Sequence, residues 1–327
     1  MTRAARFSYF FLIAVIVLAA ATHLATPLIT VLFSYFALRR LYFGKRKWLA
    51  LVLFFVVVAA TLYGSGFLIR QAFVAFPKIA VESIPPLIAY AQSRGIELPF
   101  SDLDSLKAAI VDVVKNEFLF VGNFARAATT QLVFVLIGIV VAVSLFLNPR
   151  IEKSSNKPKR PDLFTTVTDE IKIRFQLFYK SFETVMGAQI RISAINTLLT
   201  TIFVLAVSLK YKTFVIGLTF LCGLLPIVGN VISNAIIVGI AITMSPRLAI
   251  IALIFLIAIH KLEYFLNSKI IGDLIKNPVW LTLLALIIGE RIMGIPGMIL
   301  APVVLNYIKV EASKWPPPDV VHVDKRN

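Results

Sequence analysis

Residues 223–233 read Gly-Leu-Leu-Pro-Ile-Val-Gly-Asn-Val-Ile-Ser and lie in the middle of an apolar run, residues 213–244. Pro226 removes a backbone donor, Gly229 loosens the helix that remains, and Asn230 adds an amide. In hydrocarbon an unpaired backbone group costs several kcal/mol, so a broken helix persists only where protein or a water-filled cavity surrounds the break. The stretch therefore predicts either one broken span or a re-entrant hairpin, and it marks a candidate site.

The rest of the chain has the composition of a membrane protein. It has 327 residues, of which 59% are hydrophobic and only 15% are charged, and its mean hydropathy is +0.88. In soluble domains about a quarter of residues are charged. Apolar runs of about 20 residues, enough to cross a hydrocarbon core of roughly 30 Å, recur along the sequence. We predict an all-α, polytopic integral membrane protein in contact with the lipid bilayer.

The net charge of +16 is concentrated in short loops between apolar runs. One basic cluster lies at residues 39–47 and another at residues 150–160, and the positive-inside rule places both in the cytoplasm. No nucleic-acid recognition motif accompanies the charge, so we expect no nucleic-acid partner.

The sequence offers few groups for a metal, a cofactor or ATP. The single cysteine, Cys222, lies in an apolar run, and the three histidines are scattered, at His23, His260 and His322. A Walker-type glycine loop for ATP is missing from the sequence. We expect no cofactor and no metal site, and any uphill transport must draw on an ion gradient or another subunit.

The first half of the chain divides into three segments. Residues 1–70 are predicted to form N-terminal transmembrane helices. Residues 7–38 form either two short helices or one long kinked helix, and residues 48–69 form a span. A retained first helix is favoured over signal-peptide cleavage after Ala21. Residues 71–128 carry five basic and six acidic residues, a net charge of −1, which indicates an extracytoplasmic segment with an amphipathic helix starting near Ser101. Residues 129–147 then return to the cytoplasm.

The second half divides into three further segments. Residues 148–187 are predicted to be a cytoplasmic loop and an interfacial amphipathic helix, which either anchors the chain or moves with the transport domain. Residues 188–310 are predicted to form a C-terminal transmembrane core. It contains a span at 192–209, a second span at 248–259 that is followed by a polar string at 260–269, and an apolar run at 280–308 that is broken twice. Residues 311–327 form a cytoplasmic tail.

Ionisable residues occur beside these breaks. Glu263 follows an apolar run, whereas Glu290 and Arg291 interrupt one, and charged groups inside a membrane are functional candidates by default. The alternative is pairing at the membrane interface, with Lys261 and Lys269 beside Glu263. Broken helices near the bilayer midplane commonly form transport sites, but glycine and proline also serve close packing alone.

The order of these features resembles the autoinducer-2 exporter family of permeases. Its pattern is a Pro-x-x-Gly break, a Ser-Pro before the next helix, a polar segment leading to a lysine-hydrophobic-hydrophobic-glycine step, and a last helix with Gly-x-x-Gly followed by Ala-x-Pro or Val-Pro. The matching residues here are Pro226 to Gly229, Ser245-Pro246, Lys269-Ile270-Ile271-Gly272, and Gly294 to Gly297 with Ala301-Pro302. The chain departs from the pattern at Asn230, where the family often has a second proline, and at Tyr264 and Ser268.

The resemblance implies a secondary transporter or exporter in the bacterial inner membrane, with about eight transmembrane segments and both termini cytoplasmic. Family members are associated with export of autoinducer-2 or with sodium/proton antiport, so the resemblance implies a small polar solute or ion as cargo. The sequence is compatible with a homo-oligomer. The predicted pathway residues are Pro226, Gly229, Asn230, Glu263, Asn267, Lys269, Gly272, Glu290, Arg291, Gly294, Gly297 and Pro302.

Two other functions stay open at this point. A non-transporting membrane scaffold or envelope-stress partner would use residues 71–128 and the cytoplasmic helix for protein contacts. An intramembrane enzyme would need a paired acid and base or a metal site, and the sequence shows no such constellation at helical spacing in its spans, so we do not expect an enzyme.

Overall fold

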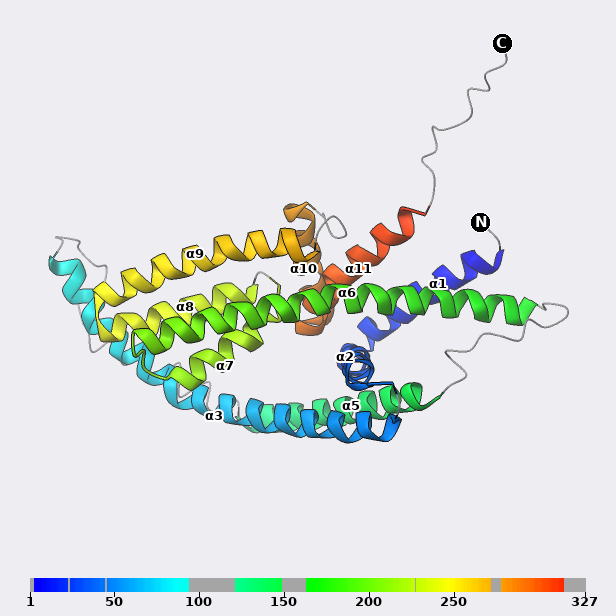
Figure 1. The fold of residues 1–327 in the computed structure, drawn as a ribbon, viewed down its shortest axis with the longest axis horizontal. Helices are drawn as coiled ribbons and strands as arrows, with labels where there is room; N and C mark the ends of the chain where they lie inside the picture. Colours follow the sequence, from blue (N-terminus) through cyan, green and yellow to red (C-terminus); the bar gives the residue numbers. More distant parts are fainter. Residues whose placement is uncertain are drawn as a thin grey trace, which may run out of the picture. The chain divides into compact units, whose positions relative to one another are not determined.

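The computed structural model describes residues 3–22, 24–44, 46–93, 121–148, 163–226, 228–271 and 278–314 (Figure 1). Within these ranges every regular element is an α-helix, as predicted: α1 (Arg3–Ala21), α2 (Ala25–Leu41), α3 (Lys47–Ser93), α5 (Val121–Leu147), α6 (Leu163–Ala206), α7 (Lys212–Gly223), α8 (Val228–Met244), α9 (Pro246–Ile271), α10 (Val279–Met293) and α11 (Ile295–Ala312). Five of these helices contain stretches long and apolar enough to cross a membrane, in α1, α3, α5, α6 and α11. The prediction of an all-α polytopic membrane protein is confirmed.

The helices fall into two compact units, and the division lies inside α6, between Gly187 and Ala188. Unit 1 contains α1, the first half of α6, α10 and α11. Unit 2 contains α2, α3, α5, the second half of α6, and α7 to α9. The two predicted helix breaks therefore belong to different units, Pro226 to unit 2 and Gly294 to unit 1.

The N-terminal region forms two helices, because Thr22 and Leu24, between α1 and α2, adopt turn conformations. The next helix differs from the prediction, since α3 does not end near Ile69 but continues to Ser93. Ala75 and Ile79 in this continuation are buried in the core of unit 2, which explains why the helix persists past the apolar run. The amphipathic helix predicted from Ser101 and the loop at 149–162 lie outside the described residues.

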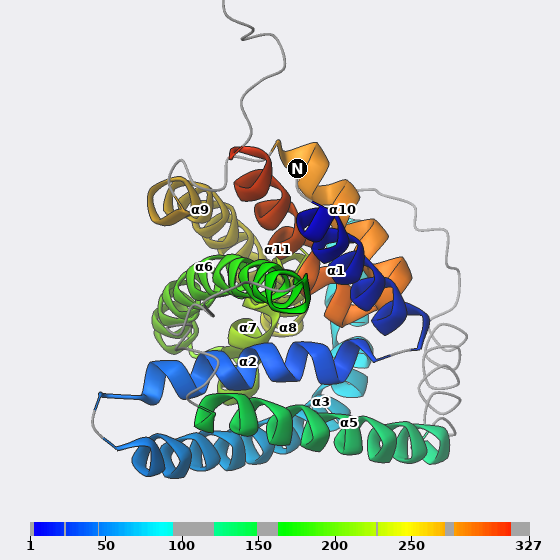
Figure 2. The same cartoon turned by 90° about the vertical axis from the view of Figure 1, so that its right-hand side faces the viewer.

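Helices α2, α3 and α5 lie side by side in unit 2 (Figure 2). Their shared core is apolar and consists of Leu38, Ala50, Phe54, Ile139, Ala142 and Phe146. The backbones of α2 and α5 approach closely at Gly138, where an added Cβ would lie 2.6 Å from Cβ of Thr30. The part of α5 that is long and apolar enough to cross a membrane is Thr129–Leu147.

Helix α6 is continuous over 44 residues, whereas the sequence predicted an interfacial helix and a separate span. At 1.5 Å per residue it is about 66 Å long, twice the thickness of a hydrocarbon core. A helix of that length cannot lie wholly across a bilayer. Its first residues, Leu163 and Phe164, are exposed apolar side chains, while Phe182 is fully buried.

Helices α7 and α8 form a hairpin, which resolves the alternatives for residues 213–244. The two short helices run in opposite directions beside α3, α6 and α9 (Figure 1). Their buried faces share one apolar core with α3, α6 and α9, built around Phe203, Phe214, Ile237, Ile240 and Leu256. Helix α9 in turn runs without interruption through the predicted polar string to Ile271.

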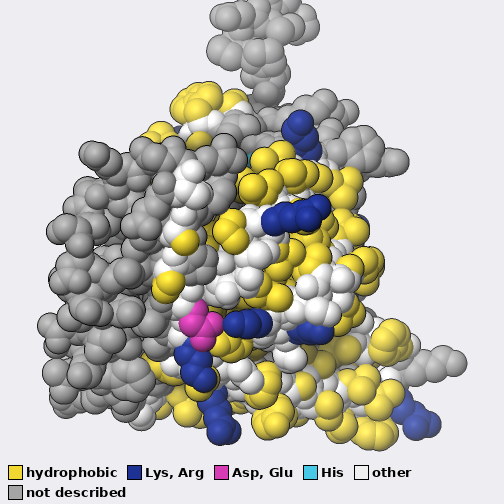
Figure 3. All heavy atoms as spheres, turned by 90° about the vertical axis from the view of Figure 1, so that its left-hand side faces the viewer, with side chains coloured by type: hydrophobic (Ala, Val, Ile, Leu, Met, Phe, Trp, Pro, Cys, Tyr) yellow, Lys and Arg dark blue, Asp and Glu magenta, His cyan; other side chains and the backbone are white. Residues whose placement is uncertain are grey.

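The end of unit 2 at which α7 begins and α8 stops carries basic side chains. Figure 3 shows Lys and Arg side chains among hydrophobic ones on this face, with one acidic side chain between them. Lys210, in the turn before α7, lies with Nζ 3.3 Å from Oε2 of Glu82 on α3. This ion pair places the start of the hairpin and the extended part of α3 at the same end of the unit.

Unit 1 contains a second helical hairpin, formed by α10 and α11. Gly294 turns the chain with φ of +63°, a conformation that glycine adopts without strain. Gly289 and Gly297 let the two helices touch, because an added Cβ on Gly289 would lie 2.5 Å from the Gly297 carbonyl oxygen. The sequence also predicted a break at Gly289-Glu290-Arg291, which is wrong: α10 continues through these residues, and Gly289 serves close packing.

Candidate functional site

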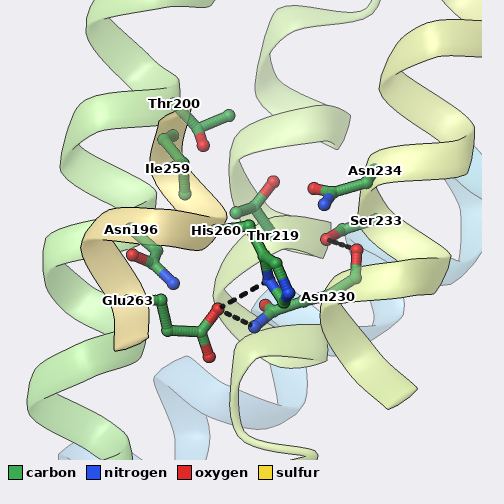
Figure 4. A pocket seen from close by; sticks show the side chains of 9 residues that line it. All are labelled: Asn196, Thr200, Thr219, Asn230, Ser233, Asn234, Ile259, His260 and Glu263. Atoms are coloured by element: carbon green, nitrogen blue, oxygen red, sulfur yellow. Dashed lines mark hydrogen bonds and ion pairs between the residues drawn. The ribbon is translucent and has the colours of Figure 1, made fainter. Parts of the chain in front are cut away.

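A small polar cavity lies inside unit 2, where α6, α7, α8 and α9 meet (Figure 4). Its volume is about 10 Å³. That is close to the space that one water molecule occupies. The lining consists almost entirely of polar side chains: Asn196 and Thr200 from α6, Thr219 from α7, Asn230, Ser233 and Asn234 from α8, and Ile259, His260 and Glu263 from α9.

Glu263 supplies the one carboxylate of the cavity lining. Its Oε2 accepts a hydrogen bond of 2.6 Å from Nδ2 of Asn230, and it lies 3.7 Å from Nδ1 of His260. Glu263 is only 8% exposed and Asn230 is 9% exposed. None of the described lining residues is Lys or Arg, so the cavity presents a carboxyl group together with amide and hydroxyl groups to an occupant.

The helix break brings Asn230 to this carboxylate. Asn230 stands in the first turn of α8, soon after the turn at residues 224–226, and Glu263 stands well inside α9. Because α8 packs along α9, the start of α8 lies against the later part of α9. The two predicted features, a broken helix and an ionisable residue, therefore meet at one cavity, through residues 33 positions apart.

Asn196 lines the cavity and carries an unpartnered acceptor. Its side chain is 4% exposed, and its Oδ1 has no hydrogen-bond partner among the described residues. Buried polar atoms are nearly always paired, so the unpaired Oδ1 of a residue at the cavity wall favours a bound water molecule as its partner. The sequence analysis missed Asn196, although an amide inside the apolar run 192–209 is a signal of its own.

Two polar side chains of α6 hold the tip of the hairpin. The last carbonyls of a helix lack partners within it, and at the end of α7 the Leu224 N–H donates to the Leu221 carbonyl oxygen and the Leu225 N–H to the Cys222 carbonyl oxygen. The carbonyl oxygen of Phe220 instead accepts a bond of 2.7 Å from Oγ of Ser193. Nε2 of Gln189 donates a bond of 2.6 Å to the carbonyl oxygen of Gly223.

Glycines make this tip compact. An added Cβ on Gly223 would lie 2.5 Å from Oγ of Ser193. An added Cβ on Gly229 would overlap the carbonyl oxygen of Cys222, a backbone atom that cannot turn aside. Pro226 lies in the turn between these glycines. The Pro-x-x-Gly motif therefore forms the turn of the hairpin and places Asn230 at the cavity.

The other predicted pathway residues that the structure describes do not line this cavity. Glu290 and Arg291 are exposed on α10, and Gly294, Gly297 and Pro302 belong to the α10–α11 hairpin of unit 1. Asn267 and Lys269 lie on α9, but their side chains are outside the described part of the chain, as is the whole of Gly272. Their role in a pathway stays a prediction.

Unit 1 contains a buried charge cluster that the sequence analysis missed. Glu311 on α11 accepts hydrogen bonds from the Tyr9 hydroxyl on α1 and from Nη1 of Arg174 on α6. Nζ of Lys314 lies 2.9 Å from the other oxygen of Glu311, and the Arg174 guanidinium stacks 4.3 Å from the centre of the Tyr9 ring. The cluster joins three helices that are far apart in sequence.

Replacing Glu311 with glutamine is expected to destabilise unit 1 by about 2 kcal/mol, because the nearly buried Arg174 loses the charge that compensates it. Thermal unfolding in detergent measures the change. The matched control is Glu170→Gln, since Glu170 also contacts Arg174, at 3.1 Å, but is more exposed and should cost about 0.5 kcal/mol. Equal effects of the two substitutions would contradict this role for Glu311.

Comparison with known proteins agrees with this membrane architecture. The family model described as AI-2E family transporter matches residues 7–316, nearly the whole chain. The chain belongs to the AI-2E transporter family. It is also similar to a protein of Bacillus subtilis (strain 168) named "Putative transport protein YdbI", with 27% identity over 241 residues, which cover 70% of this chain and 67% of the relative.

Membership confirms the family resemblance and makes this protein a membrane permease of the AI-2E family. The cavity around Glu263 lies within the matched residues and joins four helices of this AI-2E chain. It combines a helix break, a buried carboxylate and polar side chains among apolar helices.

Proposed function

We propose that this protein is a secondary transporter that moves a small polar solute or ion through the cavity around Glu263. The observation that carries the proposal is the hydrogen bond between Glu263 and Asn230, which joins a buried carboxylate to the first turn after a helix break. Carboxylates and broken helices are both costly in a membrane, and transporters use them together to bind ions and polar solutes.

The small volume of the cavity favours an ion or a water-sized species over a larger solute as cargo. A volume of about 10 Å³ accommodates a water-sized species without rearrangement. A larger solute such as autoinducer-2 requires the α7–α8 hairpin to move away from α6 or α9. Sodium and protons, the ions that the family resemblance implies, need no such enlargement.

The charge distribution supports an orientation with both termini in the cytoplasm of a bacterial inner membrane. The basic clusters at 39–47 and 150–160 flank membrane helices, and such loops remain cytoplasmic. The sequence provides no ATP-binding loop, so a gradient of protons or sodium is the proposed source of energy.

Flux measurements in liposomes test this function. Purified protein in liposomes is expected to move protons, sodium or a small polar metabolite down an imposed gradient, faster than protein-free liposomes do. Protein-dependent flux of any of these species supports a transporter. Absence of flux for all of them, with folded and inserted protein, contradicts the proposal and favours the scaffold alternative.

A further inference from the structure

The second half of α6 carries a row of polar side chains that the family motifs do not include. Gln189, Ser193, Asn196 and Thr200 follow one another at steps of four, three and four residues. With 3.6 residues per turn these four positions lie within about 60° of arc on the helix surface. The opposite face carries apolar residues, of which Leu198 is 62% and Ile202 is 58% exposed.

The polar row faces the α7–α8 hairpin and the cavity along its whole length. Gln189 and Ser193 bind the carbonyl oxygens at the hairpin tip, and Asn196 and Thr200 line the cavity. At 1.5 Å per residue the row is about 16 Å long, which is half the thickness of a hydrocarbon core. Ser193, Asn196 and Thr200 are each at most 4% exposed, so this length of polar surface is shielded from lipid.

The two ends of the row differ in their hydrogen bonding. At the tip, both polar side chains are occupied by the hairpin carbonyls that lost their helical partners. In the cavity, Oδ1 of Asn196 has no partner among the described residues. If the tip moves away from α6, Gln189 and Ser193 become free to contact water or cargo, and the polar surface then continues unbroken into the cavity.

We infer that the polar row of α6 is one wall of a water-accessible path from the hairpin tip to the Glu263 cavity, and that Gln189 and Ser193 close this path by holding the tip. The inference rests on the proposed transport function, because the path would carry the cargo to the cavity. It concerns four residues of α6 and their accessibility to water, so it can be tested without knowing the cargo.

Cysteine accessibility in the full-length protein tests the path. In a Cys222→Ser background, single cysteines replace Gln189, Ser193, Asn196 and Thr200 in turn, and Leu198→Cys and Ile202→Cys serve as controls on the same helix. Each variant in liposomes is treated with a charged, membrane-impermeant methanethiosulfonate, which reacts with the thiolate form that water favours. A neutral, lipid-soluble maleimide applied to denatured samples confirms that every cysteine is present.

We expect the four row positions to react at least about tenfold faster than the two control positions. Adding Gln189→Ala is expected to speed the reaction further at Asn196→Cys and to leave Leu198→Cys unchanged, because it releases the tip. Equally slow reaction at row and control positions would overturn the path, and a Gln189→Ala variant without effect on Asn196→Cys would overturn the gate.

The outcome separates this inference from the proposed function. If the protein shows flux in liposomes but the row positions do not react, the transport function is supported and the α6 path is contradicted. If the row positions react but no tested species is transported, the water-accessible path is supported and the transport function is contradicted.

Discussion

Replacing Gly229 with alanine prevents the α7–α8 hairpin from closing and lowers the stability of the protein by more than about 3 kcal/mol. The added methyl group would overlap the carbonyl oxygen of Cys222. A flexible side chain could rotate away from such a clash, but a backbone carbonyl in the last turn of α7 cannot. The tip must therefore open, and Asn230 moves away from Glu263. Thermal unfolding in detergent and the monodisperse fraction on size exclusion measure the effect.

Gly239→Ala is the matched control for this substitution. Gly239 stands on the same helix, α8, and its added Cβ would make an ordinary contact of 3.6 Å with Ile79. Alanine is the better helix former by up to about 1 kcal/mol, so this variant should be as stable as the wild type or slightly more so. A Gly229→Ala protein that unfolds at the same temperature as Gly239→Ala would show that the tip is not closely packed.

Replacing Glu263 with glutamine is expected to reduce transport to about a tenth of the wild-type rate or less. Glutamine preserves the shape of the side chain but removes the negative charge of the cavity. A hydrogen bond to a charged group contributes about 1.5–3 kcal/mol, which corresponds to about tenfold to a hundredfold in occupancy. The measurement is initial flux in liposomes, normalised to inserted, folded protein.

Glu290→Gln serves as the control for charge removal, because Glu290 is exposed on α10 in unit 1. Surface substitutions usually change free energies by no more than about 0.5 kcal/mol, so its flux should stay within about twofold of the wild type. Wild-type flux in Glu263→Gln would make Glu263 structural. A large loss in Glu290→Gln instead would place the essential carboxylate in unit 1.

The sequence predicted the parts of the site that carry a local signal. Proline and glycine inside an apolar run at Pro226 and Gly229 predicted the break, and a carboxylate beside an apolar run singled out Glu263. Local signals did not establish that these features meet, because the contact between Asn230 and Glu263 depends on the antiparallel packing of α8 against α9. The same rule also singled out Glu290, which is exposed on α10, and its role in a pathway stays a prediction.

Partners that come from distant helices were missed for the same physical reason. Ser193 and Gln189 bind carbonyls that only a helix end leaves free, so their role depends on where α7 stops. Arg174 and Glu311 are 137 residues apart and meet only through the packing of α6 and α11. Helix lengths were also underestimated in α3 and α6, since tertiary burial of residues such as Ala75 continues a helix beyond its apolar run.

The most direct test of the central claim is the concentration dependence of transport in Glu263→Asp. Aspartate retains the charge but withdraws the carboxylate from Asn230 by one methylene group. If the Glu263 cavity binds the cargo, the half-saturating concentration of the transported ion or solute rises by about tenfold, while the maximal rate per folded protein stays close to that of the wild type. An unchanged half-saturating concentration, with or without a lower maximal rate, would contradict binding at this cavity.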